Sequence, residues 1–166
     1  PVLVIHTGDM VGSGKEENLW WPEFFAPAKT LFATTPLYPM IGNHENNAGD
    51  GPTIPGLKQA YYDALGTNMP GNGPNNGPLD EQRGYTYSFG HKNVFFAVVD
   101  QYFYPLSTNG GYDSIDQDWL TKQLQQSFSP YKVVMAHVPV YISHFYGDDS
   151  AGVANRAQFW DSLGYN

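Results

Sequence analysis

Cysteine is absent from this 166-residue sequence, and its absence excludes several kinds of chemistry. Without thiols there are no disulfide bonds, no zinc sites built on cysteine and no thiol nucleophile. Basic residues are also few, with 8 Lys and Arg against 16 Asp and Glu, and the net charge is -8. The sequence therefore predicts no broad surface for a nucleic-acid backbone. No apolar run reaches the length of a transmembrane helix.

The remaining composition is globular, with 41% hydrophobic residues, and the length suits one domain over residues 1–166. Short apolar or alternating runs predict strands at residues 2–5, 38–41, 85–89, 94–99 and 133–136. Amphipathic patterns predict helices at residues 20–32, 57–65, 115–128 and 153–163. Strands that alternate with helices indicate an α/β fold.

A segment rich in Gly, Pro and Asn interrupts this alternation between residues 46 and 84. Within it, only residues 57–65 have a helical pattern. A long loop inside a compact domain is usually functional or mobile. We therefore expect a surface excursion over the functional site, rather than a domain boundary.

Polar side chains follow three of the predicted strands. Asp9 comes after the first strand, Asn43 and His44 after the second, and His137 after the last. Ligand sites of open α/β sheets lie at the carboxyl ends of the strands, so these side chains are expected to converge. Their oxygen and nitrogen atoms suit divalent zinc, manganese or iron, and the sequence does not choose among these metals. His6, on the first strand, is expected to be a hydrogen-bonded core histidine.

Three short blocks carry a family resemblance: GD at residues 8–9, GNHE at 42–45 and AHVP at 136–139. In this order and spacing they resemble the calcineurin-like metallophosphoesterases, and within that superfamily the bacterial phosphatases related to purple acid phosphatases. The similarity covers nearly the whole chain. It implies an α/β fold in which a β-sandwich is flanked by helices (αββα), present here as a partial catalytic domain that is incomplete at both ends.

The resemblance also implies a role for each matched residue. Asp9 would bridge two metal ions, and Asn43 and His137 would bind one of them. His44 would contact the phosphoryl oxygen or the leaving group, and Glu45 would help to orient His44. The implied reaction is hydrolysis of a phosphate mono- or diester, on a small phosphorylated substrate, by a water that a dinuclear metal centre activates.

Two blocks of the family pattern do not occur in this sequence: an Asp-x-His block before the first strand and a Gly-His-x-His block after the last helix. We expect both to lie outside it, in the complete protein, and this piece alone to bind metal incompletely and to be inactive. The purple acid phosphatases have a metal-binding tyrosine three residues after the bridging aspartate. Gly12 stands there instead, which argues against the purple subtype.

Other functions remain to be weighed against this one. A non-catalytic binding or scaffold domain that retains the fold is the main alternative, and the missing blocks would discriminate between the two. Residues 12–15 suggest a phosphate loop but lack its glycine and Ser/Thr spacing. No Gly-x-Ser-x-Gly elbow of a serine hydrolase is present. Exported relatives with similar loops favour a secreted or periplasmic protein by analogy, and the oligomeric state is not predicted.

Overall fold

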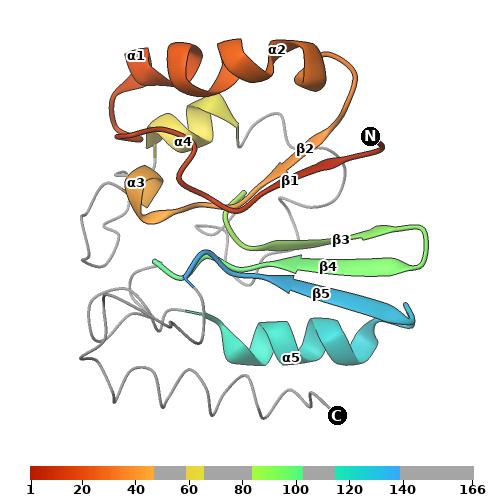
Figure 1. Ribbon diagram of the computed structural model, residues 1–166. Helices are drawn as coiled ribbons and strands as arrows, with labels where there is room; N and C mark the ends of the chain where they lie inside the picture. Colours follow the sequence, from red (N-terminus) through yellow and green to blue (C-terminus); the bar gives the residue numbers. More distant parts are fainter. Residues whose placement is uncertain (47–58, 66–83, 103–114, 139–166) are drawn as a thin grey trace, which may run out of the picture.

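The computed structural model describes residues 1–46, 59–65, 84–102 and 115–138. Figure 1 shows two β-sheets stacked face to face, with helices on both outer sides. Helices from the first part of the chain lie over one sheet, and helix α5 (Gln117–Gln126) lies against the other. This arrangement confirms the predicted α/β class and its helix-flanked sandwich.

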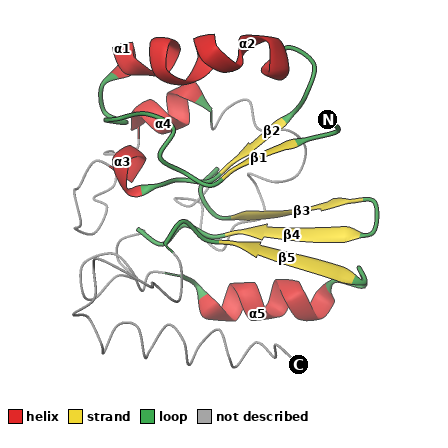
Figure 2. Cartoon of the chain, viewed as in Figure 1, coloured by secondary structure: helices red, strands yellow, loops and turns green. Residues whose placement is uncertain are grey.

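The two sheets bring four strand ends to one edge of the molecule. In the first sheet β1 (Val4–His6) pairs in parallel with β2 (Leu37–Pro39). In the second, β4 (Val94–Val98) pairs with antiparallel β3 (Tyr87–His91) and with parallel β5 (Tyr131–Met135). Strands β1, β2, β4 and β5 run in the same direction, so their carboxyl ends lie on the same side (Figure 2).

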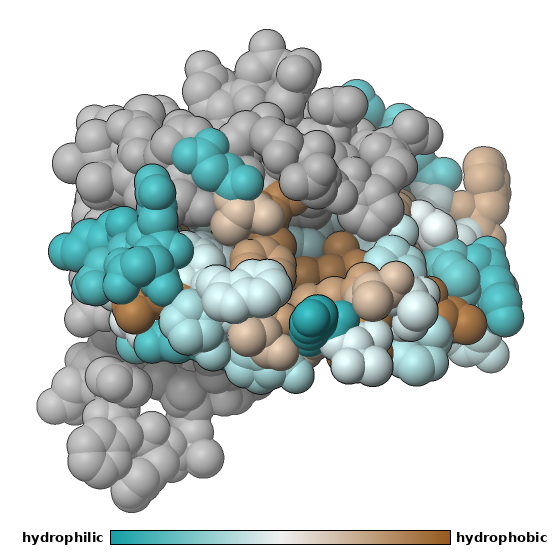
Figure 3. Space-filling model, turned by 90° about the horizontal axis from the view of Figure 1, so that it is seen from above, coloured by the Kyte–Doolittle hydropathy of each residue, from teal (hydrophilic) through white to brown (hydrophobic). Residues whose placement is uncertain are grey.

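The helical layer over the first sheet starts earlier than its sequence pattern predicted. It consists of α1 (Glu17–Leu19), the π-helical segment η1 (Trp20–Phe25) and α2 (Ala26–Phe32) in direct succession. The Ala26 N–H donates to the carbonyl of Trp21, five residues back. Proline has no N–H to donate, and Pro22 lies within this widened turn. Figure 3 looks down on this layer, whose outer surface carries both hydrophilic and apolar side chains.

The remaining helices are short, except for α5. Helix α3 (Asn43–Asn46) follows β2 after the loop at residues 40–42, and α4 (Gln59–Ala64) lies within the helix predicted at 57–65. Asp116 caps α5, since its carboxylate accepts the Trp119 N–H at 2.8 Å. The helix predicted at 153–163 and most of the 46–84 excursion lie outside the described residues. Within the described part of the chain, no helix is long and apolar enough to cross a membrane.

Three apolar clusters hold the layers together. The first packs η1 and α4 on the first sheet, with Trp20, Phe24 and Tyr61 at its centre. Another lies between the second sheet and α5. The middle cluster joins the two sheets and comprises Met40, Tyr87, Val98 and Met135, with Ile5, Tyr38, Phe89 and Phe96 packed against it.

The sheets are also joined by aromatic and polar contacts. Tyr38 of β2 stacks on Phe89 of β3 with ring centroids 3.8 Å apart, and Phe89 stacks on Phe96 at 4.8 Å. The hydroxyl of fully buried Tyr87 donates to the carbonyl of Pro39 at 2.7 Å. This bond links β3 to the end of β2, immediately before the loop that carries Asn43.

Replacing Tyr87 with Phe should lower the free energy of unfolding by about 1–3 kcal/mol, because the buried Pro39 carbonyl would lose this donor. Urea denaturation measures the change. The matched control is Tyr131→Phe, since Tyr131 is 61% exposed. Equal stability of the two variants would contradict the link between the sheets.

Stability should also fall in alkali. Burial raises the pKa of both Tyr61 and Tyr87, so the folded state favours the protonated phenols. Their contribution is complete below the unfolded-state pKa of about 10 and is lost as the pH rises above it. We expect unfolding free energies measured between pH 8 and 11 to decline less steeply for Tyr87→Phe than for the parent protein. Parallel pH profiles would contradict this expectation.

Candidate metal centre

Loops from both sheets meet in close contact at the shared edge. Gly8, after β1, has a φ of 91°, which favours glycine. A Cβ atom on Gly8 would lie 2.7 Å from both the Gly42 nitrogen and His137 Nδ1. A Cβ on Gly42 would collide with the Asp9 carboxylate and backbone. Glycine at both positions therefore allows the three loops to approach closely enough to share a site.

Asp9 projects into this junction from an unusual backbone conformation. Its φ of 56° lies in the left-handed region, which only a small fraction of non-glycine residues adopt. Oδ1 accepts the backbone N–H of His44 at 3.2 Å, and Oδ2 lies 3.5 Å from His137 Nε2. The side chain is 38% exposed, so the carboxylate remains open to solvent.

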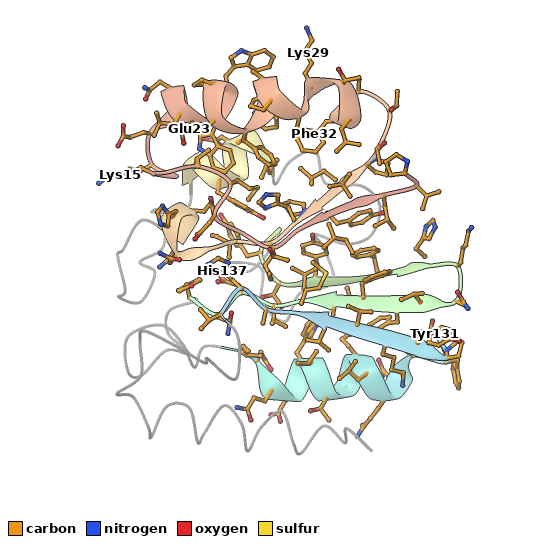
Figure 4. All side chains as sticks on the ribbon, viewed as in Figure 1. Lys15, Glu23, Lys29, Phe32, Tyr131 and His137 are labelled. Atoms are coloured by element: carbon orange, nitrogen blue, oxygen red, sulfur yellow. The ribbon has the colours of Figure 1, made fainter. Side chains whose placement is uncertain are left out.

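His137 lies just beyond β5, at the end facing the β1 and β2 loops (Figure 4). Its Nδ1 lies 2.6 Å from the carbonyl oxygen of Thr7. A carbonyl only accepts, so Nδ1 carries the proton and the lone pair of the neutral ring is on Nε2. Nε2 is 3.1 Å from Asn43 Oδ1 as well as 3.5 Å from Asp9 Oδ2.

Three electron-pair donors thus face one another: a carboxylate oxygen, an amide oxygen and an imidazole nitrogen. Acceptors gathered in this way, without a donor between them, form a site for a cation. Ligand atoms about 2.1 Å from a shared ion lie roughly 3.0–3.4 Å apart, close to the separations found here. The backbone bond that fixes the His137 tautomer is typical of metal-binding histidines. The residues present therefore fit a divalent metal.

The fit depends on the amide of Asn43. Among the described residues, no group of three or more His, Cys, Asp or Glu side chains is placed to hold a metal. With Asp9 and His137 alone the site would have two such ligands, and Asn43 supplies the third. The prediction that Asp9, Asn43 and His137 lie together agrees with these contacts; that they bind metal stays a prediction.

Glu45 fixes the shape of the loops that follow β1 and β2. Its carboxylate is fully buried and accepts four backbone N–H groups. Oε2 accepts from Asp9 and Gly42, each at 2.8 Å, and Oε1 accepts from Met10 at 2.6 Å and Val11 at 3.2 Å. Hydrogen bonds to a carboxylate are stronger than neutral ones, so this cluster holds Asp9 in its left-handed conformation.

Glu45 makes no direct hydrogen bond to the side chain of His44, so the expectation that it helps to orient His44 stays a prediction, limited to an indirect role through the loops. The partner of His44 Nδ1 is the carbonyl oxygen of Gly12, at 2.9 Å. Both Glu45 oxygens are engaged by the backbone instead. The His44 side chain is exposed, and among the described residues Nε2 has no hydrogen-bond partner. Nε2 is therefore free to meet a ligand.

His6 lies at the end of β1, beneath the junction, and packs edge-on against Phe24 with centroids 5.3 Å apart. Burial lowers its pKa, although the nearby carboxylates of Glu45 and Asp9 act in the opposite direction. Its Nδ1 is buried and has no hydrogen-bond partner within the described part of the chain, so the prediction of a hydrogen-bonded core histidine was wrong for this atom.

Two further residues support the loops and were not found from the sequence. Glu23 Oε2 accepts the backbone N–H of Gly12 at 2.7 Å. Gln101, almost fully buried, pairs with both backbone groups of Val138: Oε1 accepts its N–H at 2.6 Å, and Nε2 donates to its carbonyl at 3.2 Å. The second pairing continues the β4–β5 ladder up to the residue after His137. No residue spacing signals such contacts, because their partners are backbone atoms.

A comparison with protein-family models gives a direct assignment. The model described as "Calcineurin-like phosphoesterase" matches residues 1–159. The chain belongs to the calcineurin-like phosphoesterase family, whose members hydrolyse phosphoesters and use divalent metal ions. No curated protein and no solved structure matched significantly.

Replacing Glu45 with Gln should destabilise the protein by about 3 kcal/mol or more. Two of the four N–H groups would then face an NH₂ donor, and bonds to a charged group contribute roughly 1.5–3 kcal/mol each. Chemical denaturation measures the loss. Glu17→Gln removes the same charge from an exposed position and should change stability by less than about 0.5 kcal/mol. A Glu45→Gln protein as stable as the control would contradict the role of this carboxylate.

Proposed function

We propose that the complete protein hydrolyses a phosphate mono- or diester of small size at a dinuclear metal centre, to which this chain contributes Asp9, Asn43 and His137. The main support is the convergence of three lone-pair atoms, with Nε2 of His137 3.1 Å from the Asn43 amide oxygen and 3.5 Å from the Asp9 carboxylate. Membership of the phosphoesterase family supports the reaction class.

Asp9, Asn43 and His137 would each supply a metal ligand. The open carboxylate of Asp9 is the group able to serve two ions at once, since its side chain is 38% exposed. Asn43 and His137 would hold one ion, with the His137 ring locked by its bond to Thr7. When bound, the metal ions supply an activated water and neutralise charge on the phosphoryl oxygens. A second ion needs ligands in addition to these three.

His44 would act on the substrate rather than on the metal. Its Nδ1–H is tied to the Gly12 carbonyl, and its backbone N–H to Asp9 Oδ1. These bonds fix the ring beside the metal ligands while Nε2 projects outward. In the imidazolium form, which carries a proton on both ring nitrogens, the Nε2–H would stabilise a phosphoryl oxygen or pass its proton to the departing alkoxide, leaving the neutral ring with its remaining proton on Nδ1.

The experiment is to measure hydrolysis of p-nitrophenyl phosphate and of bis-p-nitrophenyl phosphate by the complete protein. We expect turnover with Mn²⁺ or Zn²⁺, loss of turnover after chelation, and recovery when metal is restored. Asp9→Asn should weaken metal binding, measured by calorimetry, by about 10-fold or more. His44→Asn should lower kcat roughly 10²-fold while metal affinity stays unchanged.

The matched control for His44 is His91→Asn, because His91 lies in the β3–β4 hairpin at the opposite end of the sandwich. Its kcat should equal that of the parent. A protein that binds metal tightly but cleaves neither ester would support the alternative, a scaffold domain that has kept the fold. Undiminished metal affinity in Asp9→Asn would count against the assigned ligand set.

A further inference from the structure

The loop after β1 is bound on one side by residues of the helical layer and on the other by the Glu45 carboxylate. The carboxylate of Glu23, on η1, accepts the Gly12 N–H at 2.7 Å. Two residues along, the Gly14 carbonyl accepts the indole N–H of buried Trp20 at 3.0 Å. Figure 4 shows Glu23 on the part of η1 that overlies this loop. The π-helical segment therefore anchors the loop at two points.

Gly12 has a second contact, on its other backbone group. Its carbonyl oxygen is the partner of His44 Nδ1 at 2.9 Å. Gly12 thus lies between Glu23, which holds its N–H, and His44, which binds its carbonyl. The direction of that carbonyl sets where the imidazole ring lies, and so where Nε2 projects.

Gly12 cannot set this direction by itself. Glycine has the greatest backbone freedom of any residue, and Gly12 is exposed. Of the residues that the structure describes, a Cβ built on Gly12 would meet only the Glu23 carboxylate, with its two oxygens at 3.5 and 3.9 Å. The neighbours of Gly12 are held by Glu45, Trp20 and the His44 carbonyl. The bond to Glu23 is the restraint on Gly12 itself, the residue whose carbonyl meets His44.

We propose that Glu23 is a positioning residue for His44, acting through the backbone of Gly12. This inference rests on the proposed function, since it assigns to Glu23 the task of keeping Nε2 of His44 directed at the substrate. Among the described residues, no hydrogen bond or ion pair joins Glu23 to the proposed ligands or to the His44 ring. Removal of Glu23 therefore affects the step that His44 assists and leaves metal binding intact.

The test compares Glu23→Ala with Glu17→Ala, an exposed glutamate of the same helical layer whose carboxylate has no hydrogen bond among the described residues. Hydrolysis of phenyl phosphate and p-nitrophenyl phosphate is measured at saturating metal. We expect Glu23→Ala to lower kcat about 10-fold for phenyl phosphate, with KM within 2-fold. The loss should be smaller for p-nitrophenyl phosphate, whose better leaving group needs less protonation. Glu17→Ala should match the parent.

A double variant tests whether Glu23 acts through His44. In a His44→Asn background, Glu23→Ala should cause no further loss, because its target is gone. An equal loss with and without His44 would overturn the inference. Glu23→Gln keeps an acceptor for the Gly12 N–H and should recover most of the activity; a loss as large as that of Glu23→Ala would also count against it.

A measurement that needs no turnover separates this inference from the proposed function. Nitrogen-15 spectra recorded at a pH where the His44 ring is neutral should show its single proton held on Nδ1 in the parent and in Glu17→Ala, and a mixture of tautomers in Glu23→Ala. Absence of hydrolysis by the parent would defeat the proposed function alone. A His44 tautomer unchanged by Glu23→Ala would defeat the positioning role.

Discussion

The buried carboxylate of Glu45 is the constraint on which the site depends. It gathers four N–H groups from two loops that follow different strands of one sheet. Asp9 would not otherwise remain in a left-handed conformation that L-residues rarely adopt. The free energy of the charge-assisted hydrogen bonds offsets that backbone strain. Glu45 thereby determines where the Asp9 carboxylate, which we propose as a metal ligand, points.

Most of the hydrogen bonds that position the candidate side chains share one feature. They have a backbone group on one side. Thr7 holds His137 through its carbonyl, Gly12 holds His44, and Gln101 holds the strand end next to His137. Backbone partners are fixed by the fold itself, so the site needs few mobile contacts.

The fold class and the convergence of Asp9, Asn43 and His137 could be predicted, because strand ends in a parallel arrangement share an edge and the motif blocks mark them. The contacts of Glu45 and Glu23 could not. Three of the four Glu45 contacts span 34–36 positions and the Glu23 contact spans 11, and all use the backbone N–H that every residue type except proline carries. The π-helical turn was equally hidden, since apolar periodicity does not distinguish it from an α-helical one.

The site spans the boundary between the two sheets: Asp9 and Asn43 follow strands of one, and His137 follows a strand of the other. Elsewhere, the described parts of the two sheets are joined by the middle apolar cluster, an aromatic stack and the Tyr87–Pro39 bond. An ion bound by all three ligands would be a non-covalent cross-link between the layers. A bound ion would then oppose sliding of one sheet past the other. The melting temperature would therefore rise with the concentration of free metal.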